Sequence, residues 1–223
     1  MTDSNNDSGV IFDLDGVLVD TAEYHRRAWY DLAEKENLRM SDEFFENTFG
    51  SQNAQIIPEM TDRRLSDEDV ERMSQWKEAR YREHVDGNLQ LLDGAGELIK
   101  DLKANGFRLA IGTSTPRINL EFLLENMPLH EYFDDYVTGE DVENGKPAPD
   151  TFLAAAEKLC LPAGRCVVIE DSVQGVTAGK SAGMKVIAVT TTRKRENLTQ
   201  ADITVASLDE LDIARFHELL WAD

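Results

Sequence analysis

The 223-residue sequence predicts an α/β fold: a doubly wound parallel-sheet core that carries an inserted, all-helical subdomain. Two observations support this prediction. Short apolar runs rich in Val and Ile alternate with helical patterns through the second half of the chain, as is typical of buried parallel strands. A long stretch between the first two apolar runs has charged amphipathic patterns and no strand-like run. The length fits one core domain with a smaller added unit, since a domain averages roughly 150 residues.

The predicted strands and helices follow one another in the order expected for β–α–β units. Strands are predicted at residues 9–14, 107–112, 136–138, 166–170 and 185–190. Helices are predicted at residues 95–104, 119–125, 149–159 and 173–182. Gly106 and Gly183 follow two of these helices, where glycine commonly ends a helix. This alternation favours a parallel sheet, because each helix returns the chain to the same end of the sheet.

Residues 21–87 form the predicted insertion, with amphipathic helical patterns at 23–35 and 67–84. The insertion leaves the chain just after the first strand. Open parallel sheets bind their ligands at the carboxyl ends of the strands, so an insertion there would cover the ligand site. We therefore expect residues 1–20 and 88–223 to form the core domain and residues 21–87 to form a helical cap.

The charge of the chain limits its partners. It has 43 acidic and 23 basic residues, a net charge of -20, which repels nucleic acid and anionic membranes, so we expect neither as a partner. The polar start does not resemble a signal peptide, and no apolar run approaches the ~20 residues that span a membrane. We expect a cytoplasmic protein, a monomer or weak homo-oligomer. Because the same field repels anionic metabolites, a site for one requires local positive charge.

Two carboxylates follow the first predicted strand. Asp13 and Asp15 are two positions apart, which in an extended strand would aim both side chains the same way. Two close carboxylates cannot both stay ionised without a cation or a proton. The alternative is an acidic turn in which Gly16 supplies the bend, and for an isolated Asp-x-Asp this alternative is the commoner outcome.

Three further polar stretches each follow a predicted strand. Thr113, Ser114 and Thr115 offer hydroxyls and amides that could hold a phosphate oxygen, although an ordinary helix cap would use the same residues. Lys146, in a proline-rich stretch, could offset carboxylate and phosphoryl charge or could be solvated in a turn.

The last of these stretches holds a second carboxylate pair. Glu170 and Asp171 end a very apolar strand, where hard oxygen ligands suit Mg²⁺. Asp171 or Ser172 could instead cap the following helix. The magnesium interpretation is favoured because the same edge of the sheet already holds Asp13 and Asp15.

The four stretches, in this order, closely resemble the four motifs of the haloacid dehalogenase (HAD) superfamily, and the resemblance covers nearly the whole chain. It implies a Rossmann-like core, a Mg²⁺ cofactor and a small phosphorylated molecule as substrate. The dehalogenases that gave the superfamily its name lack the second aspartate of the first motif. Asp15 therefore points to phosphoryl transfer.

The resemblance also implies catalytic roles. Asp13 would attack the phosphorus and form an aspartyl-phosphate, and Asp15 would act first as general acid and then as general base. Thr113 and Lys146 would hold the phosphoryl oxygens.

The metal ligands are implied in the same way. Asp13, the backbone carbonyl of Asp15 and Asp171 would bind the Mg²⁺, with Glu170 as an additional or outer ligand. The metal would neutralise the carboxylates and hold the transferring group.

A narrower resemblance concerns the predicted cap. Residues 20–29, Asp-Thr-Ala-Glu-Tyr-His-Arg-Arg-Ala-Trp, resemble the start of the cap in beta-phosphoglucomutases. This resemblance implies that His25 positions Asp15 and couples cap closure to proton transfer, whereas the alternative is a surface histidine. Lys77 lies where the mutase cap offers a lysine to the sugar phosphate, and its alternative is a solvated helix lysine.

One departure weakens the mutase interpretation. Asn53 stands where family mutases present an arginine to the phosphate that is not transferred. Arg117, in the loop after Thr113, could replace it. We favour hydrolysis of a small phosphorylated metabolite such as a sugar phosphate. The alternatives are a beta-phosphoglucomutase, which converts beta-glucose 1-phosphate to glucose 6-phosphate, and an inactive HAD-fold binding module.

Overall fold

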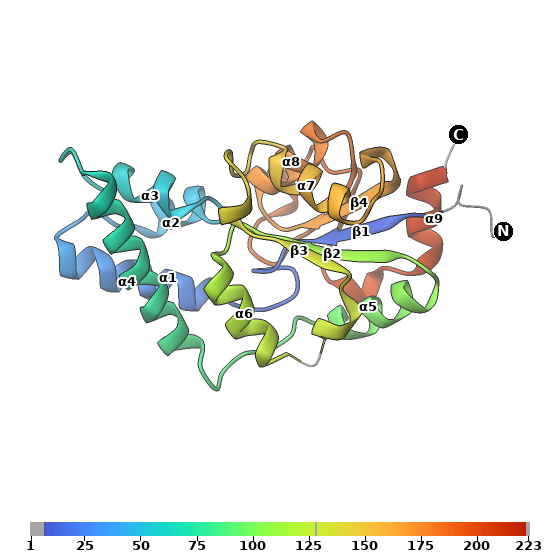
Figure 1. Ribbon diagram of the computed structural model, residues 1–223, viewed down its shortest axis with the longest axis horizontal. Coiled ribbons are helices and arrows are strands. Elements are labelled where there is room, and N and C mark those ends of the chain that lie inside the picture. Colours follow the sequence, from blue (N-terminus) through green and yellow to red (C-terminus); the bar gives the residue numbers. More distant parts are fainter. Residues whose placement is uncertain (1–6, 128, 222–223) are drawn as a thin grey trace.

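The computed structural model describes residues 7–127 and 129–221, so most of the polar start of the chain, residues 1–6, lies outside the described residues. Figure 1 shows a sheet flanked by helices in one half of the molecule and a separate group of helices in the other. The described strands form one parallel six-stranded sheet with the order β3-β2-β1-β4-β5-β6. They are β1 (Gly9–Phe12), β2 (Arg108–Gly112), β3 (Asp135–Val137), β4 (Cys166–Glu170), β5 (Lys185–Val189) and β6 (Ile203–Val205). The predicted α/β class is confirmed.

The central strand β1 lies between β2 and β4. Phe12 is in register with Ile111 of β2 and with Ile169 of β4, so the three strands end at the same edge of the sheet. Every residue of β1 is buried, because helices cover both faces of the sheet. This double burial explains why the strand is continuously apolar rather than alternating.

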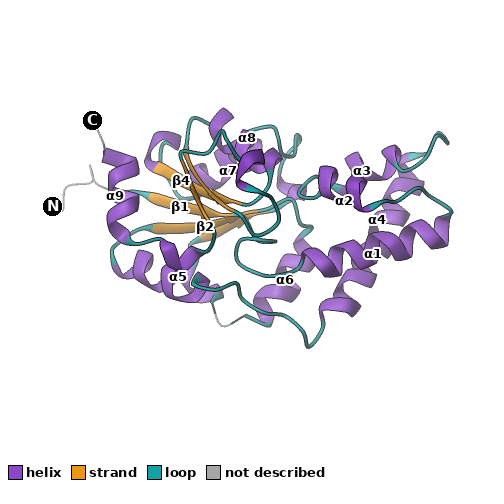
Figure 2. Ribbon diagram, turned by 180° about the vertical axis from the view of Figure 1, so that it is seen from behind, coloured by secondary structure: helices purple, strands orange, loops and turns teal. Residues whose placement is uncertain are grey.

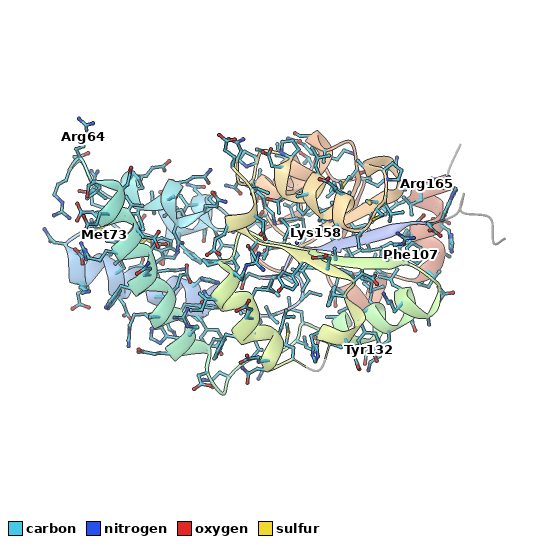
Figure 3. The ribbon with its side chains drawn as sticks, in the orientation of Figure 1. Arg64, Met73, Phe107, Tyr132, Lys158 and Arg165 are labelled. Carbon is cyan, nitrogen blue, oxygen red and sulfur yellow. The ribbon has the colours of Figure 1, made fainter. Side chains whose placement is uncertain are left out.

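Two layers of helices cover the sheet (Figure 2). One layer packs against Val10 and Phe12 and contains α5 (Ala95–Ala104), α6 (Arg117–Glu125) and α9 (Ile213–Trp221). The other packs against Ile11 and contains α7 (Asp150–Lys158) and α8 (Val173–Ser181). Phe107, labelled in Figure 3, meets Phe216 of α9 edge to face at 5.9 Å between ring centroids. Helix α9 and strand β6 were not predicted from the sequence.

The remaining helices form a group beside the carboxyl ends of the strands. They are α1 (Ala22–Glu36), α2 (Asp42–Thr48), α3 (Asn53–Glu59) and α4 (Asp67–Val85), and no strand occurs between residues 21 and 87. They share an apolar cluster of their own that includes Trp29, Phe45 and Met73, the last labelled on α4 in Figure 3. The sequence predicted α1 and α4 to within one residue at each end, because both are long and amphipathic. The short helices α2 and α3 were not predicted.

One segment of this helical group, residues 46–52, docks on the core, and we call it the docking segment. Three of its backbone carbonyls accept hydrogen bonds from core side chains, and its Gln52 side chain donates to a core carbonyl. The contacts are Arg193 to the Glu46 carbonyl, Gln174 to the Asn47 carbonyl at 2.7 Å, Ser114 to the Gly50 carbonyl at 2.8 Å, and Gln52 to the Gly139 carbonyl at 2.7 Å. No helix among the described residues is long and apolar enough to cross a membrane.

Candidate active site

Asp13 lies directly after β1, where its backbone N–H donates to the Ile169 carbonyl of β4 at 2.9 Å. Its side chain is buried, and its Oδ1 is 2.9 Å from Nζ of Lys146. The same Nζ is 2.7 Å from Oε1 of Glu170, so one buried lysine pairs with two buried carboxylates. Burial raises the pKa of Asp13 to about 7 despite the charge of Lys146, and the nearby charge of Glu170 adds to the rise.

Three buried carboxylates form a candidate metal site. Ligand atoms of Asp13, Glu170 and Asp171 all lie within 4.8 Å of one another. Oδ1 of Asp171 is buried and has no hydrogen-bond partner among the described residues, while Oδ2 accepts from the Thr192 hydroxyl. Burial, followed by the charges of Glu170 and Asp13, raises the pKa of Asp171 well above its usual range. Clustered oxygen ligands that repel one another at a buried site fit a divalent cation such as Mg²⁺.

Glu170 is the most fully engaged of the three carboxylates. Its Oε1 accepts from Lys146, and its Oε2 accepts from the backbone N–H groups of Asp171 and Ser172, each at 2.8 Å. The Ser172 hydroxyl donates to the same oxygen at 2.9 Å and also caps α8 by accepting from the Gly175 N–H at 3.0 Å. These bonds occupy Glu170 oxygens that a metal would otherwise use, which favours an outer role for this residue.

Asp15 lies beyond the strand, in a tight turn. Gly16 adopts φ +82°, in the left-handed region that favours glycine, and its N–H donates to the Val19 carbonyl at 2.8 Å. Asp15 and Asp13 line the same cavity, as the alternation rule predicted, but the turn rather than a continued strand brings Asp15 there. The structure therefore contains both the acidic turn and the paired carboxylates that the sequence offered as alternatives.

Three donors converge on the Asp15 carboxylate. The hydroxyls of Thr21 and Thr115 donate to its two oxygens, and Nε2 of His25 is 3.3 Å from Oδ1. Burial alone would raise the pKa of Asp15, but His25 and the two hydroxyls hold it well below its usual range. Thr21 and His25 come from the start of the helical group and Thr115 from the core, so Asp15 is held from both sides.

The residues that follow β2 make different contacts. Thr113 is buried at the cavity, and its hydroxyl oxygen accepts from the Thr115 N–H at 3.1 Å. Helix α6 begins at Arg117 with Pro116 at the capping position, so Thr113 is not its cap. Ser114 lines the cavity but donates its hydroxyl to the docking segment, at Gly50.

His25 and Lys77 are both buried and meet inside the helical group. The His25 ring stacks on Tyr81 with centroids 3.9 Å apart, and Nζ of Lys77 is 2.9 Å from its Nδ1. A lysine ammonium only donates, so Nδ1 is the acceptor of this pair and the ring proton lies on Nε2, which faces Asp15. Neither residue is the solvated side chain that the sequence left open.

Glu78 is a cavity residue that the sequence analysis missed. It is buried, its Oε1 is 2.9 Å from Nζ of Lys77, and its other oxygen accepts from the amide of Asn119 on α6. Asn53, also at the cavity, donates to Oε1 of Glu78. The sequence carries no signal for Glu78, because α4 is rich in charged residues and only the packing shows which of them faces inward.

Arg117 is not brought to the cavity. Its Nη2 is 2.6 Å from Oδ1 of Asp141, and its guanidinium lies 5.4 Å from the centre of the Tyr136 ring. It lines a separate surface cavity beside β3. The structure therefore gives no support to Arg117 as a replacement for the arginine that Asn53 displaces.

The cavity itself has a volume of about 50 Å³ and lies between the core and the helical group. It is lined by most of the residues that the sequence singled out. These are Asp13, Asp15, His25, Asn53, Lys77, Thr113, Ser114 and Thr115. Lys146, Glu170 and Asp171 are buried behind Asp13 rather than in the cavity wall.

Comparisons with known proteins agree with this geometry. Protein CbbY of Rhodobacter capsulatus is 34% identical over 193 residues, which are 80% of this chain and 83% of that protein. Fructose-1-phosphate phosphatase of Escherichia coli is 31% identical over 184 residues, 82% of this chain and 96% of that protein. The crystal structure of beta-phosphoglucomutase from Clostridium difficile matches with a TM-score of 0.88 at 29% identity, covering 96% of this chain and 97% of that one.

The family assignment follows from the extent of these matches. The family model named haloacid dehalogenase-like hydrolase matches residues 10–189, which include every motif residue around Asp13. The match runs through both the sheet and the inserted helices. The chain belongs to the haloacid dehalogenase-like hydrolase family.

Proposed function

We propose that this enzyme hydrolyses small phosphate monoesters, sugar phosphates among them, through an aspartyl-phosphate on Asp13. The observation that carries the proposal is a buried carboxylate at the wall of a cavity, 2.9 Å from a buried lysine and within 4.8 Å of two further carboxylates. The similarity to a fructose-1-phosphate phosphatase supports the substrate class.

The residues present fit Mg²⁺, which enzymes of this family generally use. Asp13 and Asp171 would hold the ion together with the backbone carbonyl of Asp15, while Glu170 would orient Lys146 and the backbone behind it. When bound, the ion neutralises carboxylate and phosphoryl charge and so lets the two approach each other. Lys146 supplies a second, permanent positive charge beside the phosphoryl oxygens, and Thr113 offers a hydroxyl.

The reaction takes two displacements. In the first, an oxygen of Asp13 forms a bond to phosphorus, the ester bond breaks, and Asp15 in its protonated form gives its proton to the leaving alkoxide. In the second, the ionised Asp15 takes a proton from a water molecule that attacks phosphorus. The bond between phosphorus and Asp13 then breaks, releasing inorganic phosphate and restoring the enzyme. Three donors on Asp15 stabilise the ionised form that this second step needs.

The helical group over the site would act as a cap. We assign residues 21–87 to this cap and residues 1–20 and 88–223 to the core domain. Thr21 and His25 contact Asp15 from the cap side, so closure would complete the environment of the acid–base residue. Opening would admit substrate and release phosphate.

Turnover of p-nitrophenyl phosphate tests the proposal. We expect hydrolysis that requires Mg²⁺ and stops on addition of a chelator. If the wild-type protein is as inactive as Asp13→Asn with Mg²⁺ present, the proposal fails and a binding module is the better description. If p-nitrophenyl phosphate is hydrolysed, the rates for a panel of sugar phosphates would show which of them the enzyme prefers.

A second candidate function is beta-phosphoglucomutase activity. The similarity to a beta-phosphoglucomutase structure over 96% of this chain favours it. A cap that closed over the site would protect an aspartyl-phosphate from water. Incubation of beta-glucose 1-phosphate with a trace of the 1,6-bisphosphate separates the two functions. Glucose 6-phosphate without release of phosphate would establish the mutase, whereas free phosphate with no glucose 6-phosphate would exclude it.

A further inference from the structure

The cap side of the active-site cavity contains a fixed ion pair. Nζ of Lys77 is 2.9 Å from Oε1 of Glu78, and both side chains line the cavity although each is almost completely buried. The two charges cancel at close range. A group that enters this part of the cavity therefore meets a dipole rather than a positive charge.

Glu78 is held in its ionised form. Burial alone would raise its pKa, but the charge of Lys77 and the amide of Asn53 bring the pKa below its usual value. The Asn119 amide from the core donates to the second carboxylate oxygen. The negative charge therefore stays in place when the cap is closed.

Among the described residues that line the cavity from the cap side, no cation other than Lys77 balances the Glu78 carboxylate. Apart from His25, Lys77 and Glu78, the cap contributes aromatic, aliphatic and uncharged polar groups: Trp29, Phe49, Gly50, Ser51, Asn53 and Ile56. His25 accepts from Lys77 at Nδ1, which makes its ring neutral.

The adjoining cavity also lacks a net positive charge. It has a volume of about 530 Å³ and shares Asn53, Glu78, Ser114 and Pro116 with the first cavity. Its charged lining consists of one arginine, Arg82, and three carboxylates, Glu71, Glu78 and Glu140. A substrate that extends into it meets a net negative wall.

We propose that Glu78 selects phosphate monoesters whose leaving group is uncharged and rich in hydroxyls, and rejects esters that carry a second phosphate. A second phosphate would lose water beside a carboxylate with no net positive charge to replace it, which is costly. Hydroxyls fit better, because among the described residues one N–H of Lys77 donates no hydrogen bond and one acceptor position of Glu78 remains open. The inference rests on the proposed function and narrows its substrate class.

Competition experiments test the inference, with p-nitrophenyl phosphate as the reporter substrate. Fructose 1-phosphate and fructose 1,6-bisphosphate are the probes, since they differ by one phosphate, and each is measured as a competitor whether or not it is turned over. We expect the wild-type enzyme to bind the monophosphate at least about tenfold more tightly, as expected for one unfavourable buried charge contact. Equal or tighter binding of the bisphosphate, or no competition by either ester, overturns the inference.

Two variants assign the effect to the ion pair. Glu78→Gln leaves Lys77 unbalanced, so the preference for the monophosphate should fall by about tenfold, whereas Lys77→Gln should increase it. Glu68→Gln, on the exposed side of the same helix, removes the same charge from the protein and should leave the preference unchanged. If Glu68→Gln changes the preference as much as Glu78→Gln, the acidic surface as a whole rather than Glu78 causes it.

Failure of the inference is distinguishable from failure of the proposed function. If p-nitrophenyl phosphate is not hydrolysed with Mg²⁺, the proposed function itself is wrong. If it is hydrolysed and the two fructose esters compete equally, only the role of Glu78 is wrong. The wild-type comparison needs no variant, so it stands even if Glu78→Gln does not fold.

Discussion

Lys146 forms two ion pairs, one with Asp13 and one with Glu170, and all three side chains are buried. Removing the charge of Asp13 while keeping its shape isolates its role as nucleophile. We expect Asp13→Asn to lower kcat for p-nitrophenyl phosphate by about a thousandfold or more, because an amide cannot form the phosphoryl intermediate. Acid quenching followed by mass spectrometry should find a phosphoryl group on the wild-type protein and none on the variant. A phosphorylated Asp13→Asn protein would contradict the assignment of the nucleophile.

Gly175 shows how closely the backbone approaches the site. A Cβ atom at this position would lie 1.7 Å from Oε1 of Glu170, whose position is fixed by Lys146 and two backbone N–H groups. We expect Gly175→Ala to cost about 1–3 kcal/mol of unfolding free energy and to lower kcat, because Glu170 must move away from Lys146. Denaturant unfolding and kinetics measure both effects.

Gly96 supplies the control for this substitution. It also lies in a helix, α5, but a Cβ there would meet no atom within 4 Å. Gly96→Ala should stabilise the protein by about 0.4–1 kcal/mol and leave kcat unchanged. Equal stabilities for the two variants would show that the contact with Glu170 does not constrain the helix.

The sequence located the motif residues of the core because each follows a buried strand, and parallel strands end at one edge. Asp13, Thr113 and Asp171 can be placed together from the strand order alone. The positions of Glu78 and Arg117 cannot be predicted in this way. On a charged helix such as α4, or at the first residue of a helix such as α6, the periodicity does not say which charged side chain turns toward the cavity, and the tertiary packing decides it.

Whole elements also differ in how well the sequence predicts them. Strands β1, β2, β4 and β5 were predicted to within two residues because they are continuously apolar, which follows from burial on both faces. Strand β6 has three residues at the edge of the sheet, too few to show a period. Helix α9 does have an amphipathic pattern in the sequence, and its Phe216 is buried in the core.

The docking segment is one of the places where the helical group contacts the core near the site. Arg193 donates to the Glu46 carbonyl across this boundary, whereas Arg195, two residues later, donates to the Thr204 carbonyl within the core at 2.6 Å. We expect Arg193→Ala to speed amide hydrogen exchange in residues 46–52 and to raise KM severalfold, with little change in melting temperature. Arg195→Ala removes a similar side chain and should leave exchange in the docking segment unchanged. If both variants behave alike, Arg193 does not hold the cap.

The excess of acidic residues is a property of the whole chain that neither the site nor the helical group explains. The ion pairs at the surface are partly exposed, and each such pair typically contributes less than about 1 kcal/mol. The excess of carboxylates remains, because 43 acidic residues outnumber 23 basic ones. Repulsion among them should oppose the compact state at low salt.

Salt therefore has two opposing effects on stability, and the charge balance decides between them. Screening weakens the attractive pairs at the surface, but it also weakens the repulsion among the unpaired carboxylates, which act over distances comparable to the Debye length of about 10 Å at 0.1 M. With a net charge of -20, the second effect should be the larger. We expect the melting temperature at neutral pH to rise by a few degrees between about 0.02 and 0.5 M NaCl. A chelator must be present throughout, so that trace Mg²⁺ bound at the carboxylate cluster does not stabilise the fold by itself. A melting temperature that falls with added NaCl would mean that the surface ion pairs, and not the excess negative charge, dominate the electrostatics of this protein.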